Sequence, residues 1–219
     1  MNRGQIRTEF SQRAPDSPAT TTQMDLWSQR GANHIARLLK LFPTSGNINI
    51  LASTGSYDLI SSFSLFLKLN LTGGVFYYDG DYEPLKIVNR AWLDQNATGW
   101  KNADEDEPVM CFKEGNYLYL YPTPATAKTN GLQVYYFSKP TQMTGDSSDP
   151  FNGRGDLDDL HEAIVLYMVW KTKQSVGVSD QAEVAKNEFY GFLRESDLWI
   201  AEDEGVVNEI FRPYHLNRS

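Results

Sequence analysis

The chain has 219 residues, enough for one large domain or two small ones with a core that needs no disulfide or metal. Its formal net charge of −8 disfavours extensive nucleic-acid binding, because Lys and Arg supply most of the affinity for phosphates. Its single cysteine, Cys111, excludes an intrachain disulfide and a multi-cysteine metal site, and it favours a reducing compartment.

The N-terminal part of the sequence predicts two helices and no signal peptide. Residues 1–25 lack the apolar core of a signal sequence, and the chain has no 18-residue apolar run, so we expect a soluble, cytoplasmic protein without a membrane partner. Ile6 and Phe10 lie one helical turn apart in a short helix over 3–13. A second, amphipathic helix begins after the threonines at 20–22 and ends before Pro43. Its apolar face consists of Met24, Trp27, Gly31, Ile35, Leu38, Leu39 and Phe42.

From Thr44 to about Lys139 the hydrophobic period changes from 3.6 to 2, and turn residues separate short runs of β-formers. The predicted strands are 47–51, 56–60, 66–72, 75–78, 109–112, 117–121 and 132–137. Seven short strands of this kind predict an antiparallel sandwich or barrel.

Two of these strands carry specific expectations about burial. Side chains alternate between the two faces of a strand, so four leucines should share a buried side: Leu65, Leu67, Leu69 and Leu71. In the strand 117–121, the two leucines should be core. The three tyrosines between them form either a second packed face or a surface for a partner. We expect this strand to form a hairpin with 132–137, because Pro122 and Pro124 end it.

The C-terminal part returns to helical periodicity after a Gly/Ser/Asp-rich linker at 144–155. Asp156 is the predicted N-cap of a helix that Gly177 ends, and Ser179 caps a further helix. The apolar face of that last helix is Ala182, Ala185, Phe189, Phe192, Leu193, Ser196, Trp199 and Ile200. The final fifteen residues have no helical period but stay apolar, which indicates an arm that docks on its own domain or on a partner.

Together these elements predict an α+β protein. The N- and C-terminal helices form a bundle, an antiparallel β-sandwich or barrel-like domain is inserted in it, and an extended C-terminal tail follows. The predicted boundaries are 1–43 and 151–204 for the two parts of the bundle, 44–150 for the β-rich domain and 205–219 for the C-terminal arm.

No motif in the sequence predicts catalysis, a cofactor or a metal. His161-Glu162 begins like a zinc-protease motif, but Val165 stands where the second histidine would be needed. Phosphate-binding and serine-hydrolase signatures are also missing from the sequence. Two other functions stay open as alternatives. The tyrosine-bearing strands could form a carbohydrate-binding sandwich, and two of the many carboxylates could act as in a muramidase-type hydrolase.

The order of segments resembles the adaptor proteins of tailed bacteriophages, also called head-to-tail connector or head-completion proteins. The resemblance covers about residues 3–193. The segments that carry it are LWSQRGANHIARLLKLFP, GSYDLIS, YEPLKIVNRAWLD, GNYLYLYPTPAT, LQVYYFSKPTQM, LHEAIVLYMVWKTKQSVG and DQAEVAKNEFYGFL.

This resemblance implies a non-enzymatic virion protein, made in the host cytoplasm and placed at the head-tail interface. It implies a ring of twelve copies that joins the portal protein to the tail or nozzle protein, with DNA passing through without specific binding. The predicted contacts with the portal or a neighbouring subunit are Ile210, Phe211, Arg212, Tyr214 and Leu216. The predicted acidic residues at the lumen or rim, which would not attract phosphates, are Asp104, Glu105, Asp106, Glu107, Glu202, Asp203 and Glu204.

Overall fold

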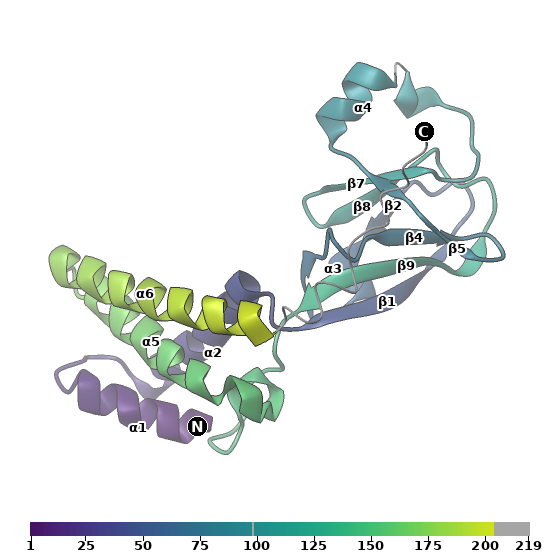
Figure 1. Cartoon of the computed structure of the whole chain (residues 1–219). Coiled ribbons are helices and arrows are strands. Elements are labelled where there is room, and N and C mark those ends of the chain that lie inside the picture. Colours follow the sequence, from purple (N-terminus) through teal and green to yellow (C-terminus); the bar gives the residue numbers. More distant parts are fainter. Residues whose placement is uncertain (98, 204–219) are drawn as a thin grey trace. The chain divides into compact units, whose positions relative to one another are not determined.

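The computed structural model describes residues 1–97 and 99–203, of which 197–203 are described by their backbone only. The chain divides into two compact units (Figure 1). One unit contains Met1–Leu39 and the chain from Pro140 onward, and the other is Lys40–Lys139. The second unit is therefore inserted between two parts of the first. This arrangement confirms the α+β fold class with a β-rich insertion in a helical bundle.

The helical unit is built around α5. Its elements are α1 (Arg3–Arg13), α2 (Thr21–Leu39), the 3-10 turns η2 (Pro150–Gly153) and η3 (Gly155–Leu160), α5 (His161–Ser175) and α6 (Ser179–Asp203). Helix α5 contacts α1, α2 and α6, and Figure 1 shows α5 and α6 side by side. Gly177 makes the tight turn between them possible, because its φ of +77° is a left-handed conformation that favours glycine.

Helix α1 is fastened at its N-terminal end to a distant segment of the chain. Asn2 and Gln5 form a capping box, in which the side chain of Asn2 accepts from the backbone N–H of Gln5. The backbone N–H groups of Arg3 and Gly4 still need acceptors. The N–H groups of Arg3 and Gly4 donate to the carbonyl oxygens of Ser148 and Asp146, each at 2.9 Å. The segment predicted as a linker thus contains a docked stretch that belongs to the helical unit.

Helix α2 packs closely on α5 through small side chains. Its buried residues are Ser28, Gly31, Ala32, Ile35, Ala36 and Leu39. A Cβ added to Gly31 would lie only 3.1 Å from the ring of Tyr167, so glycine permits the close approach of the two helices. Leu38, which was predicted to be in the core, is 42% exposed because it lies outside this stripe.

Helix α5 begins later than its predicted cap. Gly155–Leu160 forms a 3-10 turn, and the α-helix starts at His161 without a side-chain cap. Leu157 and Leu160 are both buried, which the three-residue period of a 3-10 turn allows. Asp156 instead accepts a hydrogen bond from Nε of Arg154 at 3.0 Å, so the prediction that it caps the helix was wrong.

The β-rich unit contains two sheets within its described residues. The larger sheet contains β1 (Pro43–Ile50), β9 (Lys128–Ser138), β4 (Val75–Tyr78), β5 (Tyr82–Pro84) and β3 (Phe66–Leu69). The smaller sheet contains β2 (Ser56–Asp58), β8 (Tyr117–Tyr121), β7 (Met110–Glu114) and β6 (Lys86–Ile87). The helical segments of this unit are α3 (Leu59–Ser62), α4 (Arg90–Asn96) and the 3-10 turn η1 (Trp100–Asn102). All strand pairs are antiparallel in the described residues except β6 with β7.

Both sheets contribute to one hydrophobic core, which makes the unit a sandwich. Ile48, Leu132 and Val134 come from the larger sheet, and Leu118 and Leu120 from the smaller one. The burial predicted for the two leucines of β8 is therefore confirmed.

Of the four leucines predicted to share a buried side around β3, only Leu69 is buried, so the prediction was wrong for the other three. Phe66 and Leu69 are buried there, whereas Leu65 is 37% and Leu71 is 66% exposed. The pairing of β3 with β9 contains an irregularity between Phe66 and Lys68, which breaks the strict alternation of faces. The strand also ends at Leu69, so Leu71 falls in the turn that follows.

The hairpin that contains β8 also differs from the prediction. Strand β8 pairs with β7 and β2, whereas β9 belongs to the other sheet. Glu114 pairs with Tyr117, so Gly115 and Asn116 form a two-residue turn. Gly115 has a φ of +58°, the kind of backbone that such tight hairpins need. The Gly-Asn pair is therefore the local signal for this hairpin, and the prolines only end the strand.

We predict that replacing Phe10 with alanine strongly destabilises the helical unit. Phe10 is fully buried, and removal of a buried aromatic ring costs about 3–5 kcal/mol through lost burial and the cavity left behind. Leu26→Ala is the matched control, because Leu26 is 46% exposed on α2. Denaturant unfolding followed by the helical circular dichroism signal measures both. Equal losses in the two variants would contradict the packing described for α1.

Candidate interaction surfaces

The acidic loop, residues 104–107, is held on the surface of the β-rich unit. The N–H of Asp106 donates to the carbonyl of Thr123 at 3.0 Å, and Glu105 accepts from the hydroxyl of Ser53 at 3.0 Å. All four acidic residues are exposed. Glu107 lies 3.6 Å from Nζ of Lys128, an exposed pairing that solvent screens. The loop therefore presents several carboxylates from a fixed backbone.

The other predicted acidic and contact residues lie in the last turn of α6 or outside the described residues. Glu202 and Asp203 lie in the last turn of α6, where only the backbone is described. Glu204 and the predicted tail anchors lie outside the described residues, namely Ile210, Phe211, Arg212, Tyr214 and Leu216. Their roles stay predictions.

The tyrosines of β8 form a second, partly packed face. The ring of Tyr119 stacks on Phe112 with centroids 4.8 Å apart and nearly parallel planes. Trp100 of η1 lies edge-on to Phe112 and Tyr121. Tyr117, at the start of the strand, is 45% exposed. Internal aromatic packing thus accounts for two of the three tyrosines, in line with the first of the two roles left open for them.

The two histidines in the described part of the chain, which could have suggested catalysis or metal binding, are packed against aromatic rings. His161 is buried, and its ring is parallel to that of Phe151. The ring of His34 lies against Tyr167 and Phe189, and burial lowers the pKa of His34. His215 lies outside the described residues. Within the described part of the chain, no group of three or more His, Cys, Asp or Glu side chains is placed to hold a metal ion.

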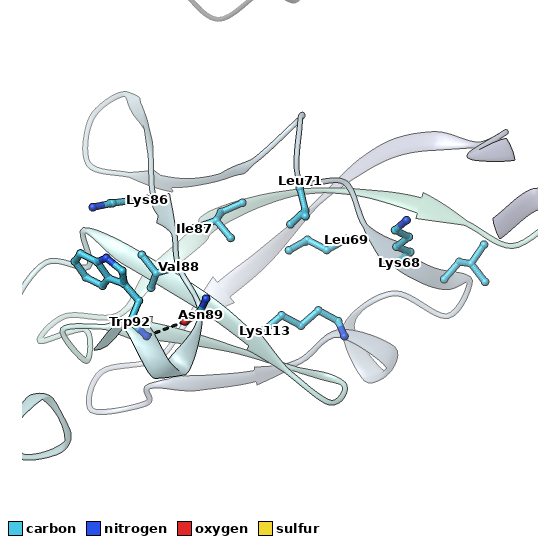
Figure 2. A pocket seen from close by; sticks show the side chains of 10 residues that line it. Lys68, Leu69, Leu71, Lys86, Ile87, Val88, Asn89, Trp92 and Lys113 are labelled. Carbon is cyan, nitrogen blue, oxygen red and sulfur yellow. Dashed lines mark hydrogen bonds between the residues drawn. The ribbon is translucent and has the colours of Figure 1, made fainter. Parts of the chain in front are cut away.

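A groove of about 670 Å³ opens in the β-rich unit, and sequence reasoning did not find it (Figure 2). Its aliphatic lining residues are Leu67, Leu69, Leu71, Ile87 and Val88. Its cationic lining residues are Lys68, Lys86 and Lys113, and we call this site the lysine groove. In Figure 2 Ile87, Leu71 and Leu69 lie between Lys86 on one side and Lys68 on the other.

The lysine groove lies along two sheet edges. In the described residues β3 is paired only with β9, and β6 only with β7, so each strand has one edge without a strand partner. Asn89 caps α4 by accepting from the N–H of Trp92 at 2.7 Å, which places the indole at the groove. Nζ of Lys86 lies 4.2 Å from the centre of this ring. No spacing in the sequence indicated this groove, because its lysines lie in strands that belong to different sheets.

In the described residues, the ammonium group of Lys113 is not paired with a carboxylate. Its Nζ donates to the carbonyl oxygen of Gly115, a neutral acceptor. Within the described part of the chain, none of the three groove lysines forms an ion pair, and no carboxylate lines the groove. The groove is thus locally cationic in a chain of net charge −8.

Comparison with known protein families identifies the relationship that the order of segments suggested. The model of the SU10 adaptor protein family matches residues 1–206, nearly the whole chain. The chain belongs to the SU10 adaptor protein family. This membership implies a phage virion adaptor and suggests a structural protein. No curated protein matches the chain.

Among residues 1–97 and 99–203, no helix has the length and apolar character needed to cross a bilayer.

We predict that Cys111 does not react with a disulfide reagent in the folded protein. The thiol is fully buried in β7, and burial raises its pKa to about 12. A raised thiol pKa keeps the unreactive protonated form at pH 8, and only thiolate attacks the reagent. Labelling should become complete after unfolding. Leu71→Cys is the control, since this position is 66% exposed and should label at once in the folded chain. Rapid labelling of native Cys111 would contradict its placement in the core.

Proposed function

We propose that this adaptor forms an oligomeric ring that joins the portal to the tail and continues the DNA channel of a tailed bacteriophage. The family match over residues 1–206 is the observation that carries the proposal. The two-unit architecture supports the proposal, because a connector needs one surface for the portal and a separate surface for the tail. By family resemblance the ring has twelve copies. DNA passes through it without specific binding, which agrees with the net charge of −8.

The proposed contact with the portal or a neighbouring subunit is the C-terminal arm. Its apolar residues follow no helical period and are interrupted by Pro213. Large aromatic and arginine side chains contribute most of the binding energy in protein interfaces, often about 2 kcal/mol or more each. Phe211, Arg212 and Tyr214 are residues of this kind, and Ile210 and Leu216 flank them.

Deletion of residues 206–219 tests the arm together with the ring. We expect the full chain to appear as rings on portal particles by negative-stain microscopy. The truncated chain should stay folded, because α5 packs against α1, α2 and α6, but it should lose portal binding. Phe211→Ala with Tyr214→Ala is the milder variant, and Asn217→Ala is its control. Undiminished portal binding by the truncated chain would refute the role of the arm, and an absence of rings with the full chain would refute the ring.

The acidic loop is proposed to face the lumen or the rim of the ring. Glu202, Asp203 and Glu204 are proposed to lie at the rim, where neighbouring copies meet. A wall of carboxylates offers no counter-charge to phosphates, so DNA slides past it. The exposure and fixed backbone of residues 104–107 support this proposal.

Neutralising the loop should slow DNA release. The variant combines Asp104→Asn, Glu105→Gln, Asp106→Asn and Glu107→Gln, and we expect several-fold slower ejection from otherwise normal particles. The control neutralises Asp180, Glu188 and Glu195, which are exposed on α6. Time-resolved DNA release measures the rate, and a cryo-microscopy map of the ring locates the seven carboxylates. A map in which all seven point outward would exclude the proposal.

A further inference from the structure

We propose that the lysine groove binds residues 202–210 of a second copy of the chain. This inference rests on the proposed oligomeric ring and assigns to it a contact between neighbouring copies. It is carried by the geometry of the groove and by the match between its chemistry and that of one segment of the same sequence.

Charge is the first part of this match. The segment EDEGVVNEI, residues 202–210, contains four carboxylates and no basic residue. The groove contributes three ammonium groups and no carboxylate. Complementary charges favour encounter and fix the register of an interface, whereas like charges placed together oppose binding. The net charge of the chain is −8, so a groove with three lysines and no carboxylate is a specific match for this acidic segment.

Apolar surface is the second part. Leu71 is 66% exposed at the groove, and Leu67 and Ile87 are only partly buried. The segment brings Val206, Val207 and Ile210 between its carboxylates. Aliphatic side chains from the segment would cover the aliphatic lining while its carboxylates reach the lysines at both ends. The volume of about 670 Å³ lies within the range of about 300–1,000 Å³ that is usual for specific binding sites.

The sheet edges add a reason for an extended peptide as the occupant. Strands β3 and β6 each have one side without a strand partner in the described residues. An extended peptide can hydrogen-bond to such an edge through its backbone, with alternate side chains entering pockets. Glu202 and Asp203 end α6, so we assign this edge pairing to residues 204–210 of the segment. Single-stranded nucleic acid is bound largely by stacking of its bases on exposed aromatic rings, and Lys86 lies over the indole of Trp92 at 4.2 Å. The aliphatic lining of the groove offers nothing to phosphates. The groove therefore favours an acidic and aliphatic peptide over DNA.

We commit to a second copy because the groove and the segment are different surfaces of one chain. Each subunit can then give its segment to one neighbour and receive another, which is the heterologous contact that closes a ring of identical chains. Binding within one chain would use up both surfaces without joining subunits.

A cysteine crosslink between two singly substituted chains tests this arrangement. One chain carries Leu71→Cys in the groove and the other carries Val207→Cys in the segment. We expect mild oxidation of the mixture to give a heterodimer, visible without reductant and absent with it. Val184→Cys replaces Leu71→Cys in the control mixture, because Val184 is 59% exposed on α6. A yield no greater than that of the control would overturn the proposal. A crosslinked monomer as the main product of the doubly substituted chain would overturn the assignment to a second copy.

Charge reversal provides a second readout. Lys68→Glu with Lys113→Glu should lower the crosslinking rate about tenfold, because carboxylates would then face carboxylates. Lys40→Glu with Lys101→Glu is the matched control, with the same change in net charge on exposed lysines of the same unit. Glu202→Lys with Glu209→Lys on the Val207→Cys chain should restore the rate. Equal rates in the groove and control variants would refute electrostatic recognition by the groove.

The test separates this inference from the proposed function. Crosslinking is measured on the purified full chain whether or not rings are visible. Rings without the crosslink would overturn the groove contact and leave the adaptor ring intact. The crosslink without rings on the portal would support the groove contact and refute the proposed ring. Oligonucleotide binding that blocks the crosslink and is lost in the Lys68→Glu, Lys113→Glu chain would assign the groove to nucleic acid instead.

Discussion

The packing of α5 is the interaction on which the helical unit depends. This helix contacts α1 and α2, which precede the insertion in the sequence, and α6, which follows it. Ile164 and Val165 are neighbours in the sequence and both are fully buried, so more than one side of the helix is covered. Burial of each such side chain contributes about 1.5–3 kcal/mol relative to exposure. These contacts join two chain segments that a hundred residues of other structure separate.

The insertion is compatible with this packing because its two ends are neighbours. Strand β1 enters the β-rich unit and β9 leaves it, and the two are paired from Pro43 with Phe137 onward. The N–H of Ser138 donates to the carbonyl of Phe42 at 2.9 Å. A sandwich with adjacent entry and exit strands adds little constraint to the bundle that carries it. Its separate core then allows surfaces of the β-rich unit to change without loss of the helical packing.

The β-rich unit carries two surfaces of opposite sign. The acidic loop presents carboxylates from a backbone fixed by Asp106 and Glu105. The lysine groove gathers cationic side chains over an aliphatic lining at the edges of the two sheets. In an acidic protein the first surface suits a passage for DNA, and the second suits a peptide of the acidic and aliphatic kind found at residues 202–210. Both assignments are proposals, and both rest on the proposed ring.

The amino-acid sequence by itself determined the elements with strong periodicity and the adaptor relationship. Helix α1 has the predicted bounds, and β4 and β8 coincide with their predicted runs, because local hydrophobic periods and turn residues set them. Only the tertiary structure decided which strands pair and which side chains meet. Because β3 is irregular, Leu71 lies at the groove and not in the predicted core. Strand β8 pairs with β7 through the turn at Gly115. Lys68, Lys86 and Lys113 come from separate strands, so no local pattern could reveal their convergence. Non-local pairing depends on register and sheet assignment, which the period of a single strand does not contain.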